Sequence, residues 1–408
     1  MRRLLGLIGL IGLMGLTGTA YAKPTQPIEP SRPNATTDTP PPHAPDHIDT
    51  TVFGWLSLDI DGQVFFIDNE YFGNRISGYT LPGFVLRPRL VLWKNHELLW
   101  GKGFTLEGGF HWLNLWGARN YPSLLSTNPW PVNTYSINRL HLLPWLQARM
   151  TFNEHLQLTL GSLGNSTHLL PLPLYDPDLL YVADPEAGVE LTYEGGHADV
   201  DLWVDWREYI WNQSIVPERF TAGLSGKLRT YWGEVQLYLP FHAVGQHEGG
   251  QNMAVSHRIN NNFNLSTGLG GSYDAGNIYI DLSCRTMWYN QRGNPAIPFT
   301  SGWGVYPELN LRFPREKSET ELTMSYWYGK DFVPLLGSWL FSNLSALTPT
   351  LIFDRTQVLV AKASHIWTSG HQPCMLRLEA SGYYYPDERR LQYSFGCSVL
   401  FNPSFRLK

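Results

Sequence analysis

The chain has 408 residues and a formal net charge of −5, and 16% of its residues are charged while 14% are aromatic. This balance, with basic residues scattered along the chain, gives no sign of nucleic-acid binding. Average soluble domains carry roughly 25% charged residues, so the composition favours a protein with a lipid-facing surface. No apolar run in the mature chain reaches the roughly 18 residues that a membrane-spanning helix needs.

The N-terminal residues predict a secretory signal peptide over residues 1–22. Arg2 and Arg3 supply a positively charged start, residues 4–16 supply a short apolar core, and Ala20-Tyr21-Ala22 forms a small-x-small cleavage site. Eight prolines then occur in residues 23–50, which predicts an extended and disordered leader. We expect residues 51–408 to form a single domain.

Apolar and polar side chains alternate along sixteen segments of that domain. Leu322 and Met324, for example, alternate with Glu321 and Thr323. Successive side chains of a strand point to opposite faces, so each segment has one apolar and one polar face. The predicted strands are residues 52–70, 82–94, 97–110, 136–152, 155–163, 188–194, 197–207, 219–229, 232–242, 260–273, 277–289, 303–313, 320–329, 355–367, 373–385 and 389–401.

The connections between these segments are alternately short and long, apart from a short final loop at residues 386–388. Outer-membrane barrels have short periplasmic turns and long extracellular loops. The pattern predicts an all-β fold, a transmembrane antiparallel up-and-down β-barrel in the cell outer membrane. It should have about 16 strands, with 14 or 18 as alternatives. A soluble β-rich sandwich also has alternating strands and remains open as an alternative.

The polar face of each strand should line the lumen, because a charged residue facing mid-membrane lipid costs roughly 2–4 kcal/mol. Several arginines of the early strands fall on this face. The third long loop, residues 164–187, carries acidic residues and no Lys or Arg. An acidic loop folded into the lumen opposite an arginine wall would create a transverse field that sorts solutes by charge. The predicted constriction residues are Arg87, Arg89, Arg139, Arg149, Asp176, Asp178, Asp184 and Glu186.

This arrangement resembles the eyelet of general bacterial porins, sixteen-stranded barrels whose third loop folds inward. The resemblance is architectural, spans the barrel-length chain and identifies no single porin family. Outer-membrane barrels usually end at an aromatic residue, whereas here seven residues follow Phe401. General porins are often trimers, so the resemblance admits a homotrimer. Its other implied partners are outer-membrane lipid, periplasmic chaperones and the barrel-assembly machinery.

A second set of residues suggests a track for solutes. Trp203, Arg207, Trp211 and Asn212 combine flat aromatic rings with a charge and an amide, which suits sugar rings. An aromatic girdle at the membrane interface together with loop packing is the favoured explanation of the same tryptophans, and a sugar track is the alternative.

Catalytic and metal motifs are not evident in the sequence. HExxH, GxSxG and P-loop motifs are absent, and His242 and His247 lack convincing ligand partners. We therefore expect no enzyme activity, no cofactor and no metal. Cys374 and Cys397 fall on the apolar face of neighbouring strands, so a disulfide and two lipid-facing thiols are both open.

The sequence as a whole predicts a porin-like channel for passive or weakly selective diffusion of small polar solutes, with sugars among the candidates. One alternative is a 14-stranded barrel that transports hydrophobic molecules or serves secretion or assembly, with a plugged lumen. The other is a secreted β-rich glycan-binding protein or hydrolase.

Overall fold

The computed structural model describes residues 55–94, 103–116, 141–210, 212–213, 215–250, 258–295, 297–348, 350–369 and 374–407. The chain divides into two compact units, Met1–Pro30 and Ser31–Lys408, and every described residue belongs to the second. The predicted signal peptide and proline-rich leader lie outside the described residues. Within the described ranges, no helix has the length and hydropathy needed to cross a bilayer.

Seventeen strands of the described chain form one sheet, with two short helices in the loops. The elements are β1 (Trp55–Glu70), β2 (Tyr79–Lys94), β3 (Gly103–Leu115), β4 (His141–Thr151), β5 (Leu156–Gly164), α2 (Leu179–Val182), β6 (Glu186–Glu194), β7 (Ala198–Glu208), β8 (Glu218–Trp232), β9 (Val235–Gly249), β10 (Asn260–Asp274), β11 (Tyr279–Arg292), β12 (Ser301–Arg315), β13 (Ser318–Lys330), η2 (Trp339–Phe341), β14 (Thr356–Thr368), β15 (Cys374–Tyr385), β16 (Arg390–Phe401) and β17 (Ser404–Arg406).

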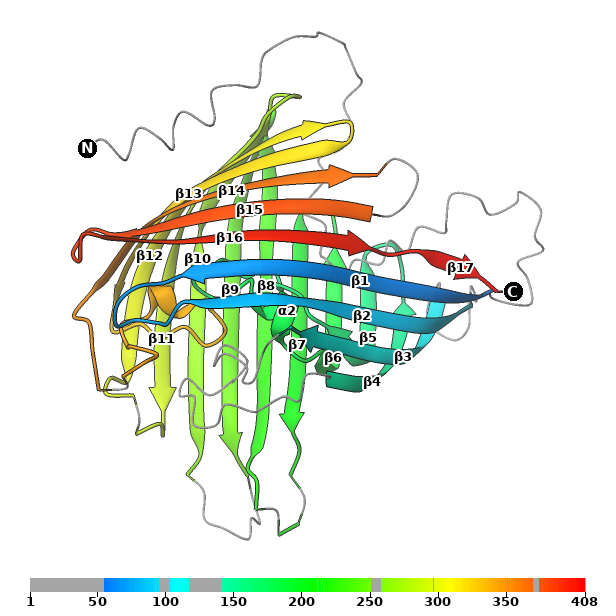
Figure 1. Cartoon of the computed structure of the whole chain (residues 1–408), viewed down its shortest axis with the longest axis horizontal. Helices are drawn as coiled ribbons and strands as arrows, with labels where there is room; N and C mark the ends of the chain where they lie inside the picture. Colours follow the sequence, from blue (N-terminus) through cyan, green and yellow to red (C-terminus); the bar gives the residue numbers. More distant parts are fainter. Residues whose placement is uncertain are drawn as a thin grey trace. The chain divides into compact units, whose positions relative to one another are not determined.

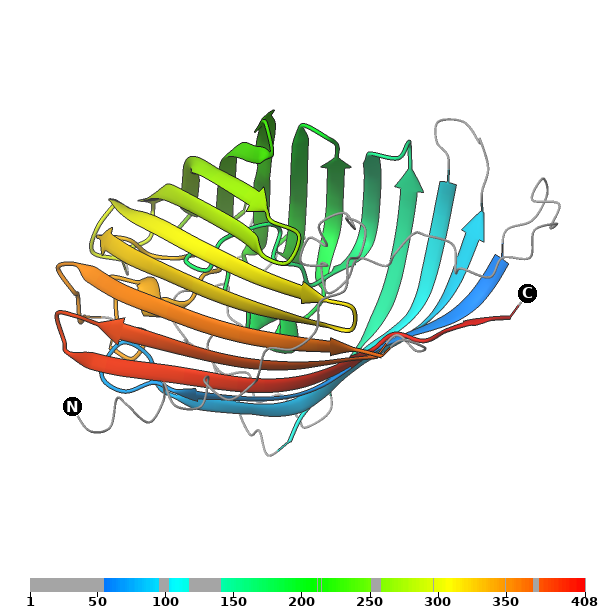
Figure 2. The ribbon, with the colours of Figure 1, turned by 90° about the horizontal axis from the view of Figure 1, so that it is seen from above.

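The strands close into a barrel. Each of β1 to β15 pairs antiparallel with the next strand along the chain, and β16 pairs with β1, where Cys397 lies opposite Phe66 and Tyr393 opposite Glu70. Figure 1 shows β16, β1 and β2 side by side, and Figure 2 shows the strands arranged around an interior. Closure leaves no unpaired edge between the first and last long strands. The predicted antiparallel barrel of sixteen strands is confirmed.

The residues beyond Phe401 extend the last strand. After a break at Asn402 and Pro403, β17 pairs with β1, placing Phe405 opposite Leu58. The Ser404 hydroxyl donates a hydrogen bond to Asp59 Oδ1 over 2.6 Å. The tail that departs from the usual aromatic terminus therefore adds three residues of pairing to the barrel wall.

The outer surface is apolar, as the alternation predicts. On β11, Leu282 is 59% exposed while its neighbour Ser283 is 2% exposed and faces inward. Cys284 and Cys397 are exposed on this outer face, and neither they nor Cys374 form a disulfide. In the β15–β16 register Cys397 lies opposite Leu378 and Cys374 opposite Phe401, so the two thiols are four residues apart along the pairing.

Two long loops fold into the lumen and pack against each other. The third long loop, residues 165–185, contacts the loop of residues 331–355. Tyr175 forms an isolated parallel β-bridge with Leu336, and Asp176 N donates a hydrogen bond to Leu336 O over 2.8 Å. Apolar side chains of the loop of residues 331–355, including fully buried Phe332 and Phe341, pack against inward-facing aromatic side chains of the strands such as Trp327. The long-loop half of the lumen is thus a packed apolar core, whereas the alternation alone predicts a water-facing interior.

Candidate functional site

The third long loop places a histidine inside the lumen. His168 and Leu169 have positive φ values of 50° and 56°, a left-handed conformation that non-glycine residues rarely adopt. The Ser225 hydroxyl of β8 donates to His168 O, and His168 N donates to Ser166 Oγ over 3.0 Å. Local strain of this kind is retained where surrounding contacts fix it, and it concentrates at functional sites.

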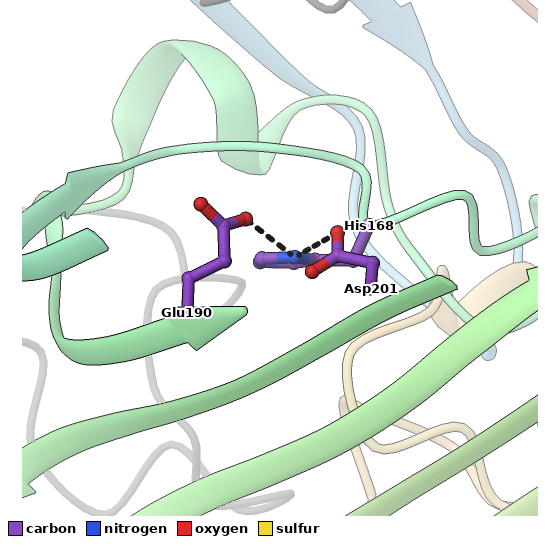
Figure 3. Close-up of side chains that lie close together, drawn as sticks. All are labelled: His168, Glu190 and Asp201. Carbon is purple, nitrogen blue, oxygen red and sulfur yellow. Dashed lines mark hydrogen bonds and ion pairs between the residues drawn. The ribbon is translucent and has the colours of Figure 1, made fainter. Parts of the chain in front are cut away.

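Three carboxylates from the barrel wall surround the His168 ring, which is 1% exposed. Nε2 lies 2.6 Å from Glu186 Oε2, and Nδ1 lies 3.0 Å from Asp201 Oδ2 and 3.7 Å from Glu190 Oε1. Figure 3 shows the imidazole edge-on between the carboxylates of Glu190 and Asp201. Glu186 and Glu190 come from β6 and Asp201 from β7, so two neighbouring strands hold the loop. We call His168, Glu186, Glu190 and Asp201 the histidine–carboxylate cluster.

A buried tryptophan stacks on one face of the His168 ring. The indole of Trp203 stacks on His168 with centroids 3.9 Å apart and an interplanar angle of 4°. The same indole lies over Gly223 of β8, where an added Cβ would sit 2.0 Å from the ring. Gly223 is thus the residue that leaves room for the stack.

The cluster holds a protonated imidazole. Burial alone would lower the pKa of His168, but the negative charge of Glu186 and the hydrogen bonds to Asp201 and Glu186 raise it to about 10. Both ring nitrogens then donate, one to Asp201 and one to Glu186. An imidazole oriented by a buried carboxylate through Nδ1 can act as a general base at Nε2 once Glu186 has taken the Nε2 proton and moved away from that nitrogen.

The cluster also has the make-up of a cation site. Ligand atoms of His168, Glu190 and Asp201 all lie within 4.8 Å of one another. Carboxylate oxygens with one imidazole suit divalent cations, and binding through Nδ1 would displace the proton that this nitrogen carries.

Two predicted constriction residues, buried Asp176 and half-buried Asp178, lie where the third loop meets β1 and β2. Asn69 Nδ2 and the Tyr79 hydroxyl each donate to Asp178 Oδ2 over 2.8 Å. Burial and the charge of Asp178 raise the pKa of Asp176 to about 7, and burial also raises the pKa of Asp178. The hydrogen bonds of Asp178 to Asn69 and Tyr79 therefore fasten the loop to the wall.

The predicted arginines Arg87, Arg89 and Arg149 lie on the barrel wall and contact other residues of the wall. Arg89 pairs with Asp61 of β1 and with Glu107 of β3, and Arg149 lies 3.8 Å from Glu107. Arg87 Nε donates to His111 Nδ1 over 2.9 Å. Arg87, Arg89 and Arg149 therefore each have at least one contact with a residue of the barrel wall. Arg139 lies outside the described residues.

The remaining predicted residues are dispersed. Asp184 pairs with His141 of β4, and this hydrogen bond lowers the pKa of Asp184 although burial opposes it, while Glu186 belongs to the cluster. Trp203 is 1% exposed under His168, Arg207 pairs with Asp205, and Asn212 is exposed in a loop. The described members of the predicted solute track therefore do not share one surface, and Trp211 lies outside the described residues.

A hydroxyl–carboxylate pair faces lipid at the long-loop end of β1 and β2. Thr80 Oγ1 donates to Asp68 Oδ1 over 2.8 Å, and the two are register partners. Exposed Phe66 and Phe395 flank the pair on the outer surface.

Sequence reasoning did not find His168. Its carboxylate partner Asp201 falls on the predicted inward face of its strand, and the run of inward acids on that strand is the one available signal. The loop has no periodicity, so the sequence gives no indication of which loop side chain reaches those acids.

Comparison with protein families identifies one match. The model of the lipid A 3'-O-deacylase-type family matches residues 48–408. No curated protein matches the chain. Because this is a family of enzymes, the expectation that the chain is not an enzyme is wrong. The sequence lacks the short catalytic motifs sought above, and the family likeness extends over the whole barrel.

Solved outer-membrane barrels resemble the chain distantly. A loop-deletion mutant of OmpT from Vibrio cholerae is 9% identical with a TM-score of 0.49, covering 85% of this chain and 99% of that one. The outer membrane protein opdK from Pseudomonas aeruginosa is 9% identical with a TM-score of 0.48, covering 86% and 99%. An anion-selective porin from Comamonas acidovorans is 11% identical with a TM-score of 0.42, covering 86% and 98%. Likeness this low does not indicate what the chain binds or catalyses.

Proposed function

Because the chain belongs to the lipid A 3'-O-deacylase-type family, we propose that it is an outer-membrane hydrolase that removes an ester-linked acyl chain from lipid A. The match over residues 48–408 is the observation that carries this proposal. Ester hydrolysis needs a group that takes a proton from the attacking water and returns it to the leaving alcohol.

The histidine–carboxylate cluster supplies that group. Asp201 orients His168 through Nδ1, which leaves Nε2 as the nitrogen that would take the proton from water. The attacking oxygen bonds to the acyl carbon, and the proton held on Nε2 then passes to the departing sugar oxygen, releasing a free fatty acid. In the described conformation Glu186 accepts a hydrogen bond from the protonated Nε2, so catalysis requires this pair to open with the Nε2 proton left on the Glu186 carboxylate, which gives a neutral imidazole with a free Nε2.

Access to the cluster also requires motion of the third loop. His168 belongs to this loop, and it and Trp203 are each 1% exposed, so water and substrate do not reach the ring in the described conformation. The acyl chains of lipid A lie outside the barrel, so the ester must enter beneath this loop. The described conformation is therefore a covered state of the proposed active site.

Mass spectrometry of lipid A incubated with purified, folded barrel tests the proposal. We expect wild-type protein to remove one acyl chain and H168Q to be slower by about 10²–10⁴-fold, the usual contribution of a general base. D201N should be slower because it disturbs the orienting hydrogen bond. H111Q is the matched control, because His111 is equally buried but lies outside the cluster.

The lipid-facing Thr80–Asp68 pair provides the contrasting outcome. If H168Q retains full activity while T80V loses it, the reaction takes place at the outer surface and the assignment to His168 is wrong. Heat-modifiable gel mobility of each variant shows whether its barrel has folded.

Diffusion of small polar solutes is the second candidate function. A pocket of about 80 Å³ below the third loop, lined by Asp61, Arg87 and Arg377 among others, favours it. The apolar packing of the two inward loops opposes it. Planar-bilayer conductance separates the two, because the packed loops predict conductance far below that of an open barrel of this strand number.

Export through the predicted signal peptide, assembly by the barrel-assembly machinery and a homotrimeric state remain proposals. Pulse-labelled processing of the precursor and the mass of the detergent-solubilised protein test them.

A further inference from the structure

A row of outward-facing side chains crosses five neighbouring strands at the long-loop end. Trp206 of β7 lies opposite Phe220 of β8, and Phe220 lies opposite His247 of β9. His247 lies opposite Asn261 of β10, and Asn261 lies opposite Arg292 of β11. We call these five residues the outer row. Its four steps between strands span about 19 Å.

The side chains of the outer row contact one another. The Trp206 and Phe220 rings lie 5.1 Å apart, and the Phe220 and His247 rings lie 5.0 Å apart and stack at 26°. His247 Nδ1 donates to Asn261 Oδ1 over 2.7 Å, which directs Nε2 away from the amide. Trp206 and Arg292 are exposed at the two ends of the row.

The position of the outer row indicates the headgroup level of the membrane. Large apolar side chains, including Leu224, Phe263 and Trp288, are exposed on the same face nearer the barrel centre. An aromatic girdle needs only aromatic rings, yet three adjacent strands here present an imidazole, an amide and a guanidinium. Outward-facing polar groups cost little at the interface and much more at mid-membrane.

At this end of the barrel, paired carboxylates and an arginine face inward, whereas the outer row presents an arginine to the outside. On the inward face, Arg219 forms ion pairs with two neighbouring carboxylates, at 3.4 Å from Glu208 and 3.0 Å from Glu248. The outer row itself contains a cation and no carboxylate. Glu218 faces outward two residues before Phe220 on β8, three strands away from Arg292.

From this geometry we propose that the outer row binds the phosphorylated sugar headgroup of a glycolipid in the outer leaflet. Arg292 and His247 Nε2 contact phosphate, Asn261 contacts sugar hydroxyls, and the Trp206 and Phe220 rings pack on the apolar face of a sugar ring. This site faces lipid and lies outside the lumen that holds His168. Binding of the headgroup by the outer row does not depend on the proposed hydrolysis at His168.

Native mass spectrometry of the full-length protein in detergent, titrated with bisphosphorylated lipid A, tests the outer row. We expect the double variant H247Q/R292Q to bind about tenfold more weakly than wild type. Lipid A stripped of its phosphates should bind wild type as weakly as that variant does. R355Q is the matched control, because Arg355 is exposed near the same end of the barrel and pairs with Asp387.

Equal lipid A binding by wild type and H247Q/R292Q overturns the proposal, and so does equal binding of phosphatidylcholine and lipid A to wild type. A change of the double variant in oligomeric mass alone, with lipid binding intact, shows that a second copy of the chain occupies the row and also overturns it. Heat-modifiable mobility confirms that each variant is folded.

Discussion

Gly223 illustrates how a single absent side chain supports the cluster. An added Cβ would lie 2.0 Å from the Trp203 indole, which is fully buried and has no room to retreat. We expect G223A to displace Trp203 and to lower the free energy of unfolding by about 1–3 kcal/mol, the usual cost of overpacking. Urea unfolding in detergent measures it. Gly108, beside which an added Cβ meets nothing within 4 Å, gives the control G108A, and an equal loss in both variants would contradict the account.

The protonation of His168 links barrel stability to pH. Its pKa is about 10 in the folded protein, against roughly 6.5 for an ordinary histidine. A raised pKa contributes stability that is complete below about 6.5 and is lost as pH rises through about 10. The temperature of the heat-modifiable transition should therefore fall from pH 7 to pH 10 in wild type. H168Q should show a shallower fall, and an identical slope in both proteins would contradict a charged His168.

At the scale of elements, Arg75 fastens the loop of residues 331–355 to the barrel rim. It is 3% exposed, pairs with Glu388 at 2.9 Å, donates to Ser342 O and Thr356 Oγ1 at 3.0 Å each, and lies 3.7 Å over the Phe353 ring. Removing one partner of such a buried network costs about 3 kcal/mol or more. We expect R75A to release this loop to proteolysis before the barrel unfolds.

The exposed pair of Arg355 and Asp387 provides the comparison for that experiment. Both side chains are exposed and their attraction is screened by solvent, so R355Q should leave the proteolysis pattern of wild type unchanged. Cleavage of R75A at the wild-type rate would show that the apolar packing of the loop is sufficient without Arg75.

The strands could be predicted from the sequence and the loops only in part. Alternation of side chains is a local property, so β11 and β13 are legible from their own residues, and closure between β1 and β16 follows from an even strand count. The packing of Phe332 and Phe341 into the lumen was not predicted, because loops carry no periodicity that records their path. The partners of Arg89 were missed for a similar reason: cross-strand pairing with Asp61 and Glu107 depends on register, which alternation alone does not specify.

At the scale of the whole molecule, the outer surface suits a lipid environment and the two inward loops fill much of the lumen. The inward loops make this barrel a scaffold that holds a buried site, in contrast to a barrel with an open channel. The catalytic role of the chain was not legible from any short motif, because His168 and its carboxylates come from a loop and two strands spread over residues 168–201. The pairing of β6 with β7 and the inward path of the third loop bring these residues together.

The central claim is that this barrel hydrolyses an acyl ester of lipid A with His168 as its base. The most direct test is the mass spectrum of lipid A after incubation with folded wild-type protein and with folded H168Q. The account predicts loss of one acyl chain, together with the matching free fatty acid, for wild type and essentially none for H168Q. Intact lipid A with wild type, or equal acyl loss with both proteins, would contradict it.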